Sequence, residues 1–110
     1  MKKDDSVYLV HITEAIESIE EYIKGIKQSD FLSKKIIQSA VIREIEIIGE
    51  ASKMLSNKLR ESHDEIPWKK IIGMRDKLIH GYFGVDLNAV WKTVKEDLPL
   101  LKKAIKKIST

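Results

Sequence analysis

Apolar residues recur at spacings of three and four along most of the chain, and this periodicity limits what the chain can fold into. The first run extends from about Ser6 to Gln28 and places its apolar side chains on one face of a helix. Its members are Tyr8, Ile12, Ala15, Ile16, Ile19, Tyr22, Ile23 and Ile26. Only two prolines and five glycines interrupt the 110 residues, and no segment shows the alternation of a strand. The sequence therefore predicts an all-α fold.

A second and longer helical pattern runs from about Phe31 to Ser62, and either Ser29 or Asp30 is a suitable N-cap for it. This pattern carries two apolar stripes. One stripe contains Ile37, Val41, Ile45, Ile48 and Leu55, and the other contains Ile36, Ala40, Ile47, Ala51 and Met54. Two stripes indicate burial on more than one side of the helix. A central place in a bundle and a subunit interface both explain the pattern.

The remaining chain predicts two further helices. Residues 62–67 are polar and predict a loop, after which a third helix extends from Pro67 to about residue 81. Asp86 is a good N-cap for a fourth helix that continues to about residue 108. Pro99 should kink or divide that helix, because proline lacks a backbone donor and clashes with the preceding turn. We expect an up-and-down bundle of four to five helices, forming a single domain over residues 1–110.

Composition limits where such a protein works. Hydrophobic residues make up 43% and charged residues 34% of the chain, as in soluble globular proteins. No apolar run approaches the roughly 20 residues that cross a bilayer, and the N-terminus does not have the pattern of a secretory signal. The chain has no cysteine, which suits a reducing compartment, so we expect a cytoplasmic protein without membrane contact. A net charge of +3 permits nucleic-acid binding but does not require it.

One segment near the end of the third predicted helix brings together residue types with chemistry. It contains Arg75, His80 and Tyr82. At about 100° per residue, Arg75 and His80 lie about 140° apart on an ideal helix, so a bend at Gly81 or a second protomer would have to bring them together. His11 and His63 have no such neighbours and are interpreted as ordinary polar residues. We find no Gly-rich phosphate loop or metal-ligand spacing, and expect no metal and no cofactor.

Arg75, His80 and Tyr82 form an Arg-x4-His-x-Tyr pattern that resembles the signature of the HepT-like branch of the HEPN superfamily. The resemblance extends over nearly the whole chain. Its other landmarks are Ile47-Ile48-Gly49-Glu50-Ala51, Pro67-Trp68, the segment from Asp86 to Trp91, and Asp97-Leu98-Pro99. Asp76 stands where asparagine is also common in such sequences.

The resemblance implies a helical-bundle homodimer in which the signature residues of both subunits face a shared cleft. It implies a metal-independent endoribonuclease that is the toxin of a toxin–antitoxin pair. The implied antitoxin is a minimal nucleotidyltransferase that silences the toxin by attaching AMP to the signature tyrosine, here Tyr82. In such a site His80 would act as the acid or base for the RNA 2′-OH and the leaving oxygen, and Arg75 would hold the phosphate.

Several residues are candidates for supporting roles. Tyr82 and Lys77 would assist RNA binding, and Glu50 would orient Arg75 or His80 or simply lie at the surface. A run of lysines at positions 102, 103, 106 and 107 is explained either by a solvated helix face or by phosphate contacts. An alternative function is a non-catalytic substrate-binding or docking subunit for a nucleotidyltransferase, and a third is a helical-bundle interaction protein.

Overall fold

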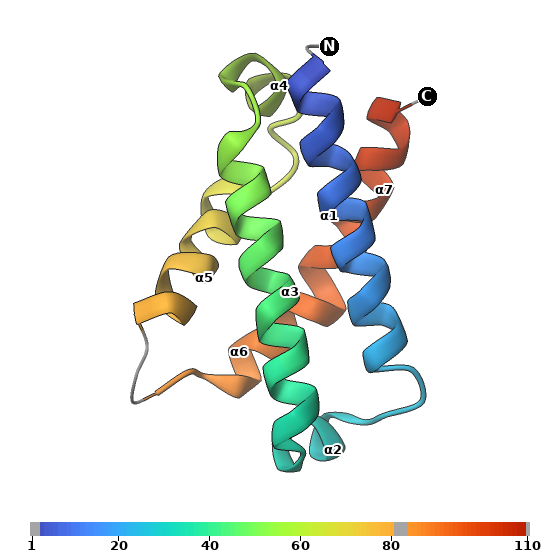
Figure 1. The fold of residues 1–110 in the computed structure, drawn as a ribbon, viewed down its shortest axis with the longest axis vertical. Coiled ribbons are helices and arrows are strands. Elements are labelled where there is room, and N and C mark those ends of the chain that lie inside the picture. Colours follow the sequence, from blue (N-terminus) through green and yellow to red (C-terminus); the bar gives the residue numbers. More distant parts are fainter. Residues whose placement is uncertain (1–2, 81–83, 110) are drawn as a thin grey trace.

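The structure is a computed structural model that describes the backbone of residues 3–80 and 84–109 and the side chains of residues 4–78 and 84–108. Every regular element within these ranges is a helix, which confirms the predicted all-α, HEPN-like fold. Three helices lie next to one another in Figure 1, with α3 between the other two, and α1 and α3 make up the front layer. The three helices are α1 (Lys3–Tyr22), α3 (Lys35–Met54) and α5 (Trp68–His80).

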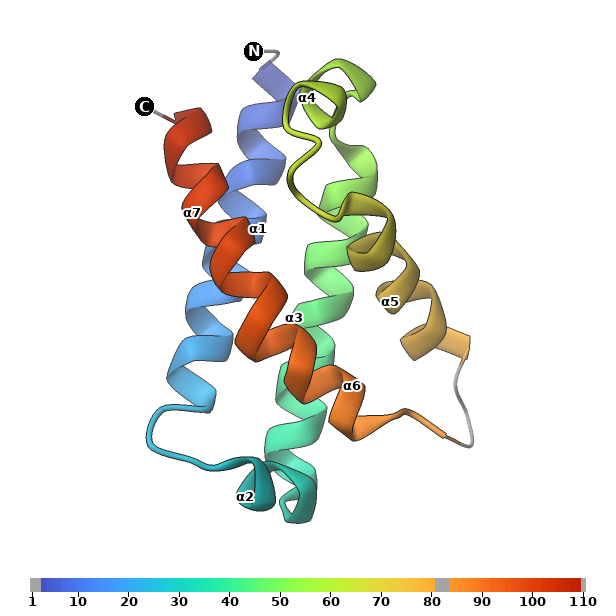
Figure 2. The ribbon, with the colours of Figure 1, turned by 180° about the vertical axis from the view of Figure 1, so that it is seen from behind.

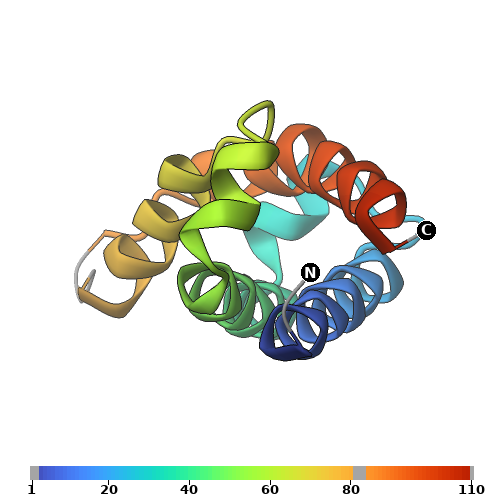
Figure 3. The ribbon, with the colours of Figure 1, turned by 90° about the horizontal axis from the view of Figure 1, so that it is seen from above.

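A continuous helical segment crosses behind this layer (Figure 2). It consists of α6 (Leu87–Lys92), the π-helical turn η1 (Thr93–Asp97) and α7 (Leu98–Ser109). The view from above shows α1 and α3 side by side, with α7 in the layer behind them (Figure 3). Lys102 on α7 donates a hydrogen bond of 2.7 Å to the Glu20 carboxylate on α1, and this bond raises the pKa of Lys102 above its ordinary value. Lys102 therefore helps to hold α7 against α1.

The two stripes of α3 have different surroundings. Val41, Ile45 and Ile48 of the first stripe are almost fully buried in the core. In the second stripe, Ile36 is 86% exposed and Met54 is 51% exposed. The central place of α3 thus accounts for the first stripe and leaves part of the second at the surface.

The prediction of one long helix from Phe31 to Ser62 is wrong, because this region forms α2 (Gln28–Ser33), α3 and α4 (Asn57–Ser62). The break between α3 and α4 has two causes. The Ser56 hydroxyl accepts a hydrogen bond from the backbone N–H of Leu59 and caps α4. The buried Asp5 carboxylate of α1 accepts hydrogen bonds of 2.8 Å from both the backbone N–H and the hydroxyl of Ser56.

The first predicted helix also ends early, at Tyr22, because Gly25 has a φ of 75° and turns the chain. The loop before Trp68 and the Asp86 cap are confirmed; Asp86 accepts a hydrogen bond of 3.1 Å from the backbone N–H of Ala89.

Pro99 does not divide the last helical segment. The backbone N–H of Leu98 bonds to the carbonyl of Thr93, five residues earlier, and this wider turn accommodates the proline ring.

No helix in the part of the chain that the structure describes is long and apolar enough to cross a membrane.

Candidate functional site

Gly49 allows α3 and α5 to approach closely at Arg75. Gly49 is buried in the middle of α3, and a Cβ atom added there would lie 2.3 Å from the Cβ of Arg75. That distance is far shorter than any ordinary contact, so a side chain at this position would displace α5 or Arg75. The glycine therefore fixes where the stem of Arg75 lies against α3.

Two carboxylates hold the Arg75 guanidinium. Its Nη2 lies 2.8 Å from Oε2 of Glu50 on α3, and its Nη1 lies 2.9 Å from Oδ1 of Asp76. The Arg75 side chain is 24% exposed, while Glu50 and Asp76 are each 53% exposed. A guanidinium has five N–H donors, and these two contacts engage the two terminal nitrogens. The group is thus oriented by the protein and still presents donors to a ligand from solvent.

The sequence left open whether Glu50 orients Arg75 or His80 or lies at the surface, and an orienting role stays a prediction. Glu50 contacts Arg75, and it reaches that residue from the position directly after Gly49. The same stretch of α3 therefore supplies both the space for the Arg75 stem and the acceptor for its guanidinium.

A second contact holds α5 from behind. Lys70 Nζ lies 2.9 Å from Oδ2 of Asp97, a mostly buried carboxylate on η1. Lys70 precedes Arg75 by five residues on α5, so this ion pair anchors the same helix to the back layer. Lys70, which lies near the signature in sequence, therefore has a structural partner.

The other signature residues are only partly described. His80 is the last residue of α5, and because the helix is continuous, its backbone lies about 140° around the axis from Arg75. Tyr82 and the His80 side chain lie outside the described residues. Lys77 is exposed and lies about 160° around α5 from Arg75, so the two do not share a face. A role for Lys77 in RNA binding stays a prediction.

Arg75 opens into a groove of about 280 Å³, here called the α1–α3 groove. The groove is lined by Tyr8 and His11 of α1, by Arg43, Glu46, Ile47, Glu50, Ala51 and Met54 of α3, and by Arg75 of α5. His11 seemed unconnected in the sequence, but the pairing of α1 with α3 brings it into the same groove as Arg75.

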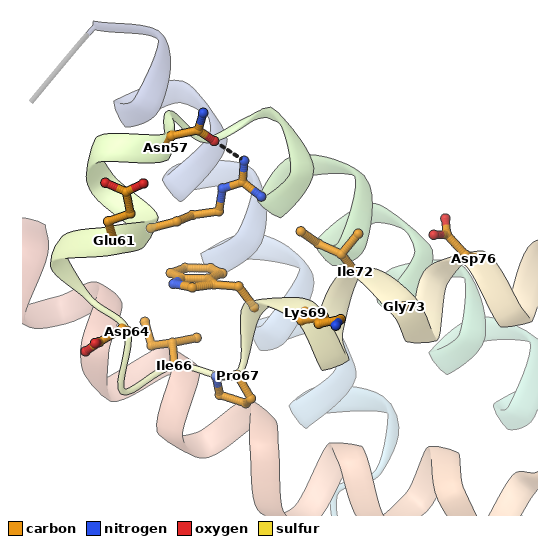
Figure 4. Close-up of a pocket in the computed structure, with 11 residues that line it drawn as sticks. Asn57, Glu61, Asp64, Ile66, Pro67, Lys69, Ile72, Gly73 and Asp76 are labelled. Atoms are coloured by element: carbon orange, nitrogen blue, oxygen red, sulfur yellow. Dashed lines mark hydrogen bonds between the residues drawn. The ribbon is translucent and has the colours of Figure 1, made fainter.

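A larger cavity of about 800 Å³ lies between α4 and α5 (Figure 4). Its apolar lining includes Ile66, Pro67 and Ile72, and three carboxylates, Glu61, Asp64 and Asp76, surround it. Its two cationic residues are Arg60, which donates a hydrogen bond of 2.7 Å to Asn57, and Lys69. Arg75 is not part of this cavity, and the excess of carboxylates makes it a poor site for a polyanion.

The family model described as "Ribonuclease HepT-like" matches residues 12–108, which is nearly the whole chain and includes every site residue named above except Tyr8 and His11. The chain belongs to the HepT-like ribonuclease family.

Individual relatives agree with this HepT-like assignment. The chain is 55% identical over 108 residues to a protein of Thermococcus cleftensis named "Probable ribonuclease HepT", and the match covers 98% of each chain. It is equally identical to a protein of Methanocaldococcus jannaschii named "Gamma-glutamylcyclotransferase and putative RNase", but spans only 49% of that protein's length. A protein of Caldanaerobacter subterraneus named "Putative RNase" is 46% identical, over 92% of this chain and 90% of its own. No solved structure matches the chain.

Sequence reasoning missed two structural features around Arg75. Gly49 had a visible signal, because a glycine in the middle of a helical pattern often marks close packing. Tyr8 and His11 gave no such signal, since they are far from Arg75 in sequence and only the pairing of α1 with α3 brings them together.

Proposed function

We propose that the chain is a metal-independent endoribonuclease that cleaves RNA with the RNA's own 2′-OH as the nucleophile. The observation that carries this proposal is the orientation of Arg75 by Gly49 and Glu50, in a chain of the HepT-like ribonuclease family. An arginine held in this way provides fixed positive charge for a phosphate that gains negative charge in the transition state.

The chemistry divides between Arg75 and His80. His80 in its neutral form accepts the proton of the 2′-OH, and in its protonated form it donates a proton to the leaving 5′-oxygen. Attack by the 2′-OH on the phosphorus breaks the bond to that 5′-oxygen, and leaves a 2′,3′-cyclic phosphate and a 5′-hydroxyl. The RNA supplies the nucleophile and Arg75 the positive charge, so the mechanism assigns no step to a metal ion.

A homodimer is part of this proposal. Within one protomer, the backbones of Arg75 and His80 lie about 140° apart around α5, so in this proposal a second subunit supplies the opposing group. Apolar side chains are exposed on the front layer: Val7 is 47% exposed, Val10 is 53% exposed, and Met54 lines the α1–α3 groove. An exposed apolar face beside a charged groove suits a shared cleft between subunits.

The biological role that we propose follows from the family resemblance. The chain is the toxin of a toxin–antitoxin pair in the cytoplasm, and its antitoxin is a minimal nucleotidyltransferase. Attachment of AMP to Tyr82 would add bulk and a negative phosphodiester close to Arg75 and His80 in sequence. That charge would repel the phosphates of RNA and thereby silence the enzyme.

The test of this proposal is RNA cleavage by the purified protein, compared with His80→Ala and Arg75→Ala. Loss of a proton-transfer group typically lowers the rate by roughly 100- to 10,000-fold. Arg75→Ala keeps the Cβ that fits against Gly49, so both variants should stay folded by circular dichroism. Cleavage that survives in both variants would contradict the proposal, and so would a folded parent protein that binds a nucleotidyltransferase but cleaves no RNA.

A further inference from the structure

The α1–α3 groove has two chemically different sides, because it is lined from two helices that both pack against α3. On the α5 side is the Arg75 guanidinium, held by Glu50. On the α1 side are the rings of Tyr8 and His11, which contact edge to face with their centroids 6.3 Å apart and their planes at 83°. The groove thus joins an oriented cation to an aromatic pair.

The part of the lining that α3 supplies is partly apolar. It includes Ile47, Ala51 and Met54, and Met54 is half exposed. The groove's volume of about 280 Å³ is slightly below the roughly 300–1,000 Å³ of typical small-molecule pockets. The groove therefore has room for one flat ring system beside Arg75 and not for an extended ligand.

The charges of the lining residues balance. Arg43 and Arg75 oppose Glu46 and Glu50, and Arg43 lies 3.8 Å from Glu46. A groove with balanced charge does not attract a polyanion along its whole length. Any affinity beyond the contact with Arg75 must come from stacking and apolar contact.

We propose that the α1–α3 groove binds the base of the nucleotide beside the scissile phosphate, with Tyr8 and His11 as its main contacts. This inference rests on the proposed function, since Arg75 is the group that would hold that phosphate. Single-stranded RNA is commonly recognised in this way, by unstacked bases that lie on aromatic side chains while cations hold the backbone. His11 and Tyr8 are substrate-binding residues here, and they take no part in proton transfer.

The experiment measures binding separately from cleavage. A fluorescent ten-nucleotide RNA of mixed sequence, 2′-O-methylated throughout so that it has no free 2′-OH, is titrated with the parent protein, His11→Ala and Tyr8→Ala. Base–aromatic stacking is typically worth a factor of at least about five per ring, so each variant should weaken binding by about five- to tenfold or more. Tyr8→Phe should bind like the parent, because it keeps the ring.

His63→Ala is the matched control. His63 is also partly exposed, but it follows the last residue of α4, lies beside Glu65, and lines a different cavity from the α1–α3 groove. Its carbonyl, which accepts the indole N–H of Trp68, is a backbone group and survives the substitution. This variant should bind RNA as tightly as the parent.

Salt dependence distinguishes stacking from phosphate contact. His11→Ala and Tyr8→Ala should lower the affinity by the same factor at 50 and 200 mM salt, because stacking releases no counterions. Arg75→Ala should instead reduce the slope of log affinity against log salt by about 0.7, the value for one contact to a single-stranded phosphate.

Two results would overturn the inference. One is binding by His11→Ala and Tyr8→Ala within twofold of the parent. The other is weaker binding that accompanies conversion to monomers in light scattering, since the groove would then be a subunit contact. A parent that cleaves unmodified RNA while the variants bind normally refutes the groove alone. A parent that cleaves no RNA, with variants that still lose binding, refutes the proposed function and supports the groove.

Discussion

Substitution of Gly49 by alanine tests whether the close approach of α3 and α5 sets the position of Arg75. The added methyl group would lie 2.3 Å from the Arg75 Cβ and 2.9 Å from its Cγ. Ordinary contact begins at 3.4 Å, so the two helices or the arginine stem must move by about 1.1 Å. The backbone of Ile71 blocks part of that movement, because its carbonyl oxygen would lie 3.4 Å from the new methyl group.

The expected magnitude has two components. An extra methyl group in a packed contact costs about 1–3 kcal/mol, and replacing a helical glycine by alanine recovers about 0.5–1 kcal/mol. The net loss of unfolding free energy is therefore up to about 2.5 kcal/mol, which lowers Tm by up to roughly 10 °C in a domain of this size. Displacement of a substrate-positioning group by about 1 Å can lower the rate of catalysis by about 100-fold.

Thermal unfolding by circular dichroism and single-turnover RNA cleavage measure the two effects. Gly73→Ala is the matched control, since Gly73, like Gly49, lies within a helix, here α5, but a Cβ atom added there has nothing within 4 Å. That variant should be equally or more stable and fully active. If Gly49→Ala matched Gly73→Ala in both Tm and cleavage, the close approach at Arg75 would not position the site.

Three further predictions concern the oligomeric state, the charge beside Arg75 and the proposed modification of Tyr82. Light scattering at micromolar concentration should give twice the 12.7-kDa mass of the chain, and a monomer would contradict the shared cleft. Asp76→Asn should keep an acceptor for Arg75 and raise RNA affinity by up to about fivefold, because one unit charge a few ångströms away is worth about 1 kcal/mol in water; unchanged affinity would mean that Asp76 does not oppose the phosphate. Tyr82→Phe should gain no AMP when incubated with the nucleotidyltransferase and ATP, as measured by intact mass, and AMP gained as readily as by the parent would move the modification to another residue.

Local chemistry made much of the fold predictable. The Asp86 cap, the loop before Trp68 and the disturbance at Pro99 each depend on residues within one or two helical turns. The break between α3 and α4 was not predictable in this way. It depends on Asp5, which lies near the start of α1 and is 51 residues away from Ser56 in the sequence. The apolar pattern of α3 continues through the break and gives no sign of it.

The candidate site shows the same division. Arg75 and Glu50 were both identified from the sequence, but the choice between a contact and a surface position for Glu50 required the packing of α3 on α5. His11 was interpreted as an ordinary polar residue because none of its neighbours in sequence belongs to the site. Its place in the groove depends on the register between α1 and α3, which a single sequence does not reveal.

The most direct test of the central claim is the mass of the fragments produced when the purified protein cleaves a short RNA in excess EDTA. The account predicts cleavage without a divalent ion, with a 2′,3′-cyclic phosphate on one fragment and a 5′-hydroxyl on the other. Fragments with a 3′-hydroxyl and a 5′-phosphate would contradict it, because those ends require an external nucleophile. Cleavage that stops in EDTA and returns with magnesium would contradict it as well.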